Sequence, residues 1–487
     1  MERLQNHSIQ IFLTVFGVFQ GFYTLTYSQN EDMGIFVTET SLIARGHGAY
    51  SKIFELKDPL FLWAGSLATW LFGVRGPFLL DATAVMVAPL AAFTLARTFK
   101  ISNNWSAMCA IAFSGALSGV YYQSLRSGTI ALVMILFAFI AARSNRWVTC
   151  GILIVSVLGF KMSFAPMLVG VPTLLFSDSK ILKRSIKFGL SGVSSFVFVA
   201  LMLIVRGEMN GYLLMVRTNF HYRNVYPDVV GITPGIGGHI NIINTYGSSF
   251  YFLCLSFITS CIAAYMLNRK HRNICEYAAV ILTFLGSILV LVSSAMWSHH
   301  LQILCLPVLM LGIVSGKFLN QFQISHQVFG AILVVVFIGS LSASGWRFPL
   351  RPLNPATQWL SPIWKIPAEV KYIETLNLGR GNVKEFARLG PNDDDGLGGF
   401  ISNDWQLVCR HYAQYGHETE SMVDEIVNCV TTRPNYIFIS PGFFSLERAS
   451  GTYNELKSRI KMTLEDNYKC VDIVERAGSQ FCTRINE

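Results

Sequence analysis

The sequence has few charged residues. Only 14% of its 487 residues are Asp, Glu, Lys or Arg, whereas 52% are hydrophobic and the mean hydropathy is +0.44. The apolar residues fall into runs of about 15 to 20, which is unlike a soluble domain. The scarcity of charge argues against an ordinary soluble enzyme. It predicts an α-helical protein that crosses a membrane many times.

Motifs for nucleotide and hydrolase chemistry are also missing. No Walker sequence, HExxH or GxSxG occurs. The stretch Gly235-Ile236-Gly237-Gly238 is not a nucleotide fingerprint, because no strand precedes it and no helix opens at it. These absences disfavour a reaction that uses ATP or a nucleotide sugar. The net charge of +9 lies at the ends of apolar runs, where basic residues anchor a membrane protein, so nucleic acid is not an expected partner.

About eleven apolar segments are candidates to cross the membrane. They are 9–27, 78–97, 105–122, 127–142, 147–160, 163–176, 188–206, 247–267, 276–295, 300–316 and 327–344. A further apolar segment, 59–73, is short, and we interpret it as juxtamembrane or re-entrant. If it crossed, the Lys and Arg clusters between the later segments would no longer all lie on one side.

The side that holds those basic clusters is predicted to be the cytoplasm. Residues 1–344 then form the transmembrane domain, with an extracytoplasmic loop at 28–58 and a second at 207–246. Residues 345–487 form a small extracytoplasmic α/β domain. We expect an integral protein of a bacterial inner (plasma) membrane with its site on the outer side.

The tail has soluble character, with a strand at 436–439 and a helix at 454–466. Strands at 469–474 and 480–485 form a hairpin across Ala477-Gly478. Its four cysteines match no zinc spacing, so disulfides are the better interpretation. We predict the pairs Cys409–Cys429 and Cys470–Cys482. In this register Cys470 faces Arg484 or Ile485, so the second pair requires a bulge.

The segment from Ser28 to Trp63 is unusually rich in charge for this chain. Adjacent carboxylates at the end of a membrane helix are costly unless water, a metal or a cation meets them. A short amphipathic helix is predicted over 38–45, with Leu42 and Ile43 on its apolar side and Gly46 at its end. The plain alternative is a solvated loop whose acids face water. The charged residues are Glu31, Asp32, Glu39, Lys57 and Asp58.

Three pieces of this segment carry a family resemblance. Asp32-Met33-Gly34-Ile35-Phe36, Arg45-Gly46-His47-Gly48-Ala49-Tyr50 and Lys57-Asp58-Pro59-Leu60 resemble the first extracytoplasmic loop of GT-C glycosyltransferases. That superfamily includes the protein O-mannosyltransferases and the lipid A aminoarabinose transferases. Two features depart from the pattern: the acid pair is ordered Glu-Asp, and Asp58 replaces a proline. The first leaves open which carboxylate is catalytic, although the spacing to the glycines favours Asp32.

The resemblance implies an inverting transfer of a sugar from a polyprenyl-phosphate donor to an extracytoplasmic lipid, glycan or protein. Such a reaction needs a base for the acceptor hydroxyl and cations for the leaving phosphate. Asp32 or Glu31 is the candidate base, and the two acids could also hold a divalent metal. The candidate phosphate ligands lie on the predicted outer side: Lys57, Lys161, Arg126, His299 and His300.

Some of these residues have an alternative role. Lys161 resembles a lysine that follows a mid-chain helix in many GT-C enzymes, but it could simply extend its ammonium to the membrane surface. One of the two adjacent histidines could be structural. In the 207–246 loop, His221, Tyr222 and Arg223 suit a sugar, but an ordinary surface loop would look the same.

Two other functions remain open at this point. One is a polymerase or ligase of surface polysaccharide, which usually carries its large outer loop late in the chain. The other is a non-enzymatic transporter of lipid or solute. A transporter should place ionisable residues in the middle of its spans, whereas here they lie at the ends.

Overall fold

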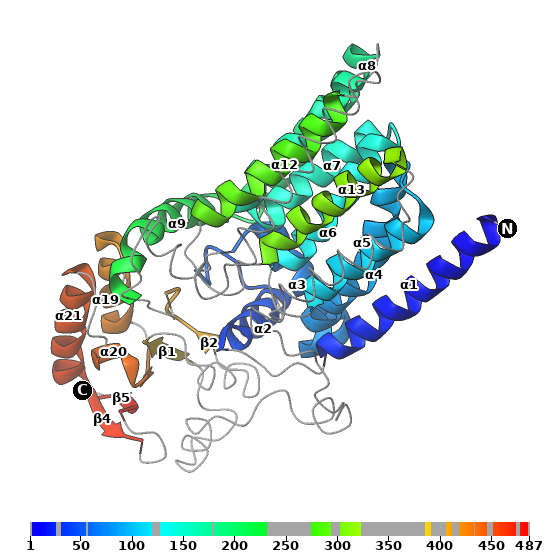
Figure 1. Ribbon diagram of the computed structural model, residues 1–487. Helices are drawn as coiled ribbons and strands as arrows, with labels where there is room; N and C mark the ends of the chain where they lie inside the picture. The colour runs from blue at the N-terminus through cyan, green and yellow to red at the C-terminus, as the bar shows by residue number, and fades with distance from the viewer. Residues whose placement is uncertain are drawn as a thin grey trace. The chain divides into compact units, whose positions relative to one another are not determined.

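The computed structural model is mostly helical with one small sheet (Figure 1). Its described residues are 2–25, 31–54, 57–118, 127–177, 180–230, 274–293, 302–322, 385–390, 406–411, 418–432, 434–445, 451–473 and 478–485. The chain divides into two compact units. The first comprises 1–27, 78–199 and 235–354, and the second comprises 28–77, 200–234 and 355–487.

Helices form most of the first unit, and nine of the eleven predicted segments lie in or overlap with them. The helices are α1 (Glu2–Leu25), α4 (Gly76–Thr98), α5 (Asn103–Ser118), α6 (Ser127–Arg143), α7 (Trp147–Phe160), η2 (Met162–Gly170), η3 (Pro172–Ser177), α8 (Ile181–Val205), α12 (Ile274–Ser293) and α13 (Cys305–Phe322). The segments 247–267 and 327–344 lie outside the described residues, so the count of eleven crossings stays a prediction. Segment 163–176 is not one α-helix but two 3₁₀ pieces, because Pro166 and Pro172 remove backbone donors.

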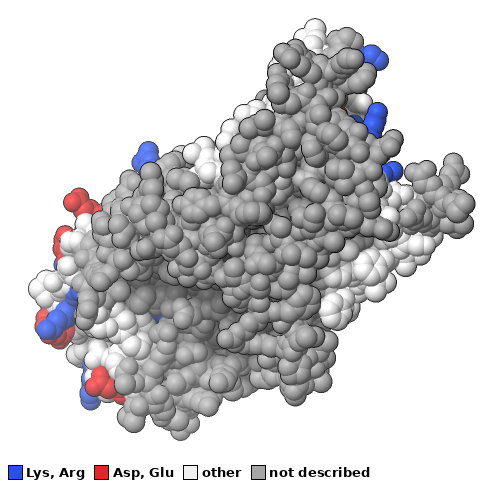
Figure 2. Space-filling model, in the orientation of Figure 1, with Lys and Arg blue, Asp and Glu red and all other residues white. Residues whose placement is uncertain are grey.

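From Gly189 to Val205 the exposed surface of α8 carries no charged residue and is largely apolar. Leu190, Phe196 and Val205 are 65%, 65% and 81% exposed. Soluble proteins rarely leave such a surface uncovered, whereas lipid covers it without cost. The exposed side of α1 is also largely uncharged (Figure 2). By length and composition, Pro59–Thr98 and Ile181–Val205 are candidates to cross a membrane. The fold class is thus confirmed as a mostly helical protein with membrane character.

One buried carboxylate links three helices of the first unit. Glu276, at the start of α12, lies 2.5 Å from Arg143 at the end of α6 and also pairs with Lys317 on α13. Both cations also lie over the Phe99 ring. A buried carboxylate needs such cationic partners, because water no longer solvates it.

Close approach of α5 and α13 requires a glycine. A Cβ on Gly316 would lie 2.2 Å from the Trp105 ring, and the Trp105 indole donates to the carbonyl of Gly312 at 2.7 Å. Small residues four apart let membrane helices touch through their backbones. Here the Trp105 side chain of α5 packs against the part of the α13 surface formed by Gly312 and Gly316.

The second unit contains a five-stranded sheet in the order β2-β1-β3-β5-β4. The strands are β1 (Glu385–Leu389), β2 (Gln406–Leu407), β3 (Tyr436–Ile439), β4 (Tyr468–Asp472) and β5 (Gln480–Arg484). β1 pairs in parallel with β2 and β3, and β5 pairs antiparallel with β3 and β4. Helices α19 (Glu420–Thr432), α20 (Gly442–Ser445) and α21 (Gly451–Asn467) pack side chains such as Val423, Phe443 and Leu456 into its core. The predicted strand at 436–439, helix and hairpin are confirmed.

Both predicted disulfides are present: Cys409–Cys429 and Cys470–Cys482. The predicted hairpin register was wrong, however. Cys470 lies directly opposite Cys482, two to three residues away from the predicted pairing with Arg484 or Ile485. The second bridge therefore needs no bulge. The Cα atoms of Cys470 and Cys482 are 4.0 Å apart, as in a close pair of an antiparallel ladder.

Four further helical pieces belong to the second unit, and they correct two predicted loops. They are α2 (Glu31–Ala44), α3 (Pro59–Phe72), η1 (Gly73–Arg75) and α9 (Met209–Val230). The acid pair thus lies in the first turn of a helix, not in a loop, and α9 occupies much of the predicted 207–246 loop. Over residues 36–43, α2 is buried on all sides, including Glu39, so the predicted amphipathic surface was wrong. α3 alone is about 21 Å long, less than the roughly 30 Å of a bilayer core.

We expect Glu276→Gln to destabilise the first unit by up to roughly 3 kcal/mol, because it leaves the partly buried Arg143 and Lys317 without a compensating charge. The measurement is the thermal unfolding midpoint of the full chain in detergent. Glu465→Gln is the control, since Glu465 makes only a 4.0 Å pair on an exposed helix surface. Equal midpoints for the two variants would contradict the role of Glu276.

Candidate functional site

The candidate site begins where α2 ends. The Gly46 amide donates to Ile43 and the His47 amide to Leu42, and Gly46 has a φ of 95°. This is a Schellman motif, which ends a helix at a glycine as the sequence predicts. The following residues, 45–58, turn back toward the start of α3. They carry three basic residues, Arg45, Lys52 and Lys57, and two acidic ones, Glu55 and Asp58.

A tyrosine closes the loop. The Tyr50 side chain is completely buried, and its hydroxyl donates to the Lys57 carbonyl at 2.5 Å. We call residues 50–57 the Tyr50–Lys57 turn. The Tyr50 ring packs edge-on against Tyr212 of α9, and a Cβ on Gly211 would lie 2.3 Å from the Tyr50 carbonyl oxygen. The start of α9 thus fixes the backbone from which Lys57 extends.

Lys57 lies close to the acidic start of α2. Its ammonium is 5.1 Å from the centre of the Phe36 ring, and Phe36 packs edge-on against Phe61 of α3. Phe36 follows Asp32 by four residues on α2, and positions with this spacing share one side of a helix. Position 32 therefore lies one turn from the ring over which Lys57 is held. The side chains of Glu31 and Asp32 lie outside the described residues.

A buried carboxylate holds the loop from a second side. Glu208, just before α9, accepts from the Ala49 amide at 3.2 Å and from Arg206 at 2.9 Å. Its side chain is fully buried. The prediction of site residues missed Glu208, because its partner Ala49 lies 159 residues away in the sequence.

The tail domain contacts the same loop. The Phe54 amide donates to the Arg410 carbonyl at 3.0 Å, and the Arg410 guanidinium donates to the Tyr50 carbonyl at 3.3 Å. The Phe54 ring also packs against the His411 ring at 4.7 Å. Nothing in the local sequence identifies these contacts, because 360 residues separate Tyr50 from Arg410.

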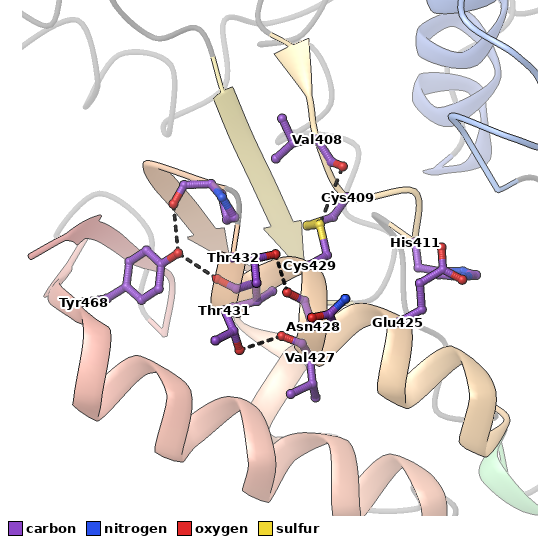
Figure 3. Close-up of a disulfide and its surroundings, with 12 residues drawn as sticks. Val408, Cys409, His411, Glu425, Val427, Asn428, Cys429, Thr431, Thr432 and Tyr468 are labelled. Carbon is purple, nitrogen blue, oxygen red and sulfur yellow. Dashed lines mark hydrogen bonds and ion pairs between the residues drawn. A yellow bond between two sulfur atoms is a disulfide. The ribbon is translucent and has the colours of Figure 1, made fainter.

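Glu425 of α19 orients both tail residues. It lies 2.6 Å from Arg410 and 3.2 Å from His411. Figure 3 shows Glu425 beside His411. Burial lowers the pKa of His411, which favours the neutral ring. Burial alone would raise the pKa of Glu425, but the His411 hydrogen bond and the charges of His411 and Arg410 outweigh it and lower that pKa. Glu425 therefore stays ionised and pairs with Arg410.

The pKa values of two other side chains near the loop are also shifted. Burial, followed by the charges of Arg45 and Lys52, lowers the pKa of His47. Burial, and then the charge of Asp58, raises the pKa of Tyr212. Both shifts favour the neutral form of the side chain.

The remaining predicted site residues are not part of this described cluster. Lys161 lies between α7 and η2 in the first unit, with its ammonium 5.7 Å from the Phe164 ring. His221, Tyr222 and Arg223 lie on α9, and their side chains are outside the described residues. Arg126, His299 and His300 lie outside them altogether. Within the described part of the chain, no three His, Cys, Asp or Glu side chains gather as a metal site.

Comparisons with known proteins gave structural likeness only. No family model matches the sequence, and neither does any curated protein. Two solved structures of ArnT from Cupriavidus metallidurans, a GT-C lipid A aminoarabinose transferase, are similar over nearly the whole chain. The apo form has 11% identity, coverage of 98% of this chain and 97% of that chain, and a TM-score of 0.40. The form bound to undecaprenyl phosphate has 11% identity, coverage of 98% of both chains and a TM-score of 0.37.

These two matches are to a member of the group that the loop resembles in sequence. At TM-scores of 0.40 and 0.37 they do not transfer an activity or a residue role to this chain. The functional argument below therefore rests on the residues of the loop and on their contacts.

We expect acidification to weaken the contact between the loop and the tail. The folded state favours neutral His411 and ionised Glu425, so it binds fewer protons than the unfolded chain. The contribution of neutral His411 to the free energy of unfolding is therefore fully present above about pH 6.5, the ordinary pKa of histidine. It decreases as the pH drops below that value. The unfolding midpoint of the full chain in detergent should be lower at about pH 5.5 than at about pH 7.5.

The control for this pH effect is His411→Gln, which cannot take up a proton. The difference between the two midpoints should shrink in this variant. A difference as large as in the unmodified chain would show that His411 does not cause it.

Proposed function

We propose that the protein is a GT-C-type inverting glycosyltransferase. It transfers a sugar from a polyprenyl-phosphate donor to an extracytoplasmic lipid, glycan or protein acceptor. The observation that carries this proposal is the placement of Lys57 over Phe36, one helical turn from Asp32. An acid and a cation can serve the two ends of one displacement reaction, the first at the attacking hydroxyl and the second at the leaving phosphate.

The two groups have complementary roles in the proposed step. The carboxylate of Asp32 accepts the proton of the acceptor hydroxyl, whose oxygen attacks the anomeric carbon of the sugar. The bond from that carbon to the phosphate oxygen breaks, and its electron pair leaves with the polyprenyl phosphate. The Lys57 ammonium stabilises the resulting negative charge, because a charge-assisted contact strengthens as the charge develops. Attack from the opposite side inverts the anomeric centre.

The contacts of the loop support an extracytoplasmic site. The backbone of Phe54 is hydrogen-bonded to Arg410, so the loop and the tail domain share one side of the membrane. The tail contains two disulfides, and disulfides persist in oxidising compartments. The absence of nucleotide motifs agrees with a site that has no access to ATP or nucleotide sugars.

We expect Asp32→Asn to fold and to insert in the membrane but to lose roughly 10²–10⁴ in transfer rate, because the base is removed. The measurement is transfer by the purified protein from a panel of polyprenyl-phosphate sugars, with products identified by mass spectrometry. Glu31→Gln is the matched variant. Loss in Glu31→Gln alone would assign the base to Glu31, and normal turnover in both variants would exclude a carboxylate base at this position.

We expect Lys57→Met to weaken binding of undecaprenyl phosphate by the full chain in detergent about tenfold or more, since a charge-assisted contact is lost. Undecaprenol, which lacks the phosphate, should bind the variant and the unmodified chain equally. Lys52→Met is the control, because Lys52 is an exposed lysine of the same loop. Lys161→Met tests the second predicted ligand: unchanged affinity would show that Lys161 does not contact the phosphate.

A further inference from the structure

Arg410 is linked to Lys57 through the backbone. Its guanidinium donates to the Tyr50 carbonyl at 3.3 Å, and the Tyr50 hydroxyl donates to the Lys57 carbonyl at 2.5 Å. Tyr50 is completely buried, so a shift of its carbonyl moves the whole Tyr50–Lys57 turn. The path from Arg410 to the backbone of Lys57, the candidate phosphate ligand, therefore consists of two hydrogen bonds with Tyr50 between them.

The guanidinium is oriented from three directions. One nitrogen contacts Tyr50, another lies 2.6 Å from Glu425, and the Phe54 ring lies beside the plane at 5.5 Å. Arginine can satisfy all three because its donors form a rigid planar fork. A lysine has a single ammonium and cannot reach the carbonyl and the carboxylate in this arrangement.

A disulfide fixes the two partners of the ion pair. Cys409 directly precedes Arg410, and Cys429 follows Glu425 by one turn of α19 (Figure 3). The Glu425 side chain is 42% exposed, and an ion pair at such exposure is weak because water screens it. The ion pair alone would therefore not keep Arg410 in place, whereas the covalent bridge does.

We propose that Arg410 is a positioning residue that holds Lys57 in its phosphate-binding place, and that the Cys409–Cys429 bridge is required for this. The inference rests on the proposed role of Lys57 toward the donor phosphate. In this arrangement the tail domain takes part in donor binding without touching the donor. Glu425 orients Arg410, and Tyr50 transmits its position.

The test is the affinity of the full chain in detergent for undecaprenyl phosphate, measured in a double-mutant cycle. Arg410→Ala should weaken binding about tenfold, the scale of one lost charge-assisted contact. In the Lys57→Met background the same substitution should have no further effect, since the group it positions is gone. Affinity for undecaprenol should not change in any variant.

Matched variants separate positioning from general stability. Arg459→Ala removes a similar pair with Asp424, the residue next to Glu425, and should leave affinity unchanged. Cys409→Ser with Cys429→Ser should reproduce the Arg410→Ala effect. Cys470→Ser with Cys482→Ser removes the other bridge and should not. Arg410→Lys should behave as Arg410→Ala, because charge without the planar fork is not enough.

The possible outcomes are distinguishable. An unchanged affinity in Arg410→Ala overturns the positioning role, as does an equal loss in the Lys57→Met background. Recovery of affinity by Arg410→Lys also overturns it, since the charge alone would then suffice. If Lys57→Met binds undecaprenyl phosphate normally, the proposed role of Lys57 is wrong, and the inference about Arg410 is wrong with it.

Discussion

The second unit depends on the hydrogen bonds and packing of one buried tyrosine. The carbonyl of Tyr50 accepts from Arg410, its hydroxyl donates to Lys57, and its backbone packs against Gly211. Three segments far apart in the sequence thus meet on a residue with no exposed surface. A buried polar group without a partner is costly, so the loss of any one of these contacts destabilises the loop. The loop that carries Lys57 is consequently part of the folded core and not a surface connection.

The first unit depends on different interactions. Its helices approach closely through glycines such as Gly316, and a single ionic cluster around Glu276 joins α6, α12 and α13. Apolar side chains on α8 remain exposed, where lipid and not protein is the partner. The described parts of the two units are therefore stabilised differently. In the first, helices pack closely at glycines around one ionic cluster, whereas in the second many polar contacts surround one loop.

The sequence predicted what is local and periodic. Apolar runs identified the helices and strand β3, the hairpin pattern identified β4 and β5, and the cysteine pattern identified both disulfides. The hairpin register failed by two to three residues, because the prediction centred the turn on Ala477-Gly478. The length of α2 failed because its residues are buried on all sides, which removes the amphipathic pattern. Arg410 and Glu208 could not be assigned, since their partners are distant in sequence and the residues have no motif of their own.

The separation of Tyr50 from Arg410 has a consequence for how the protein is made. Ribosomes add roughly 5–20 residues per second, so the 360 residues between the two partners take on the order of 20–70 s to synthesise. Throughout that time the loop is without the side chain that completes its hydrogen bonds. Insertion of the helices, by contrast, proceeds segment by segment as each emerges. The protein is thus largely built into the membrane well before its candidate site can take its final form.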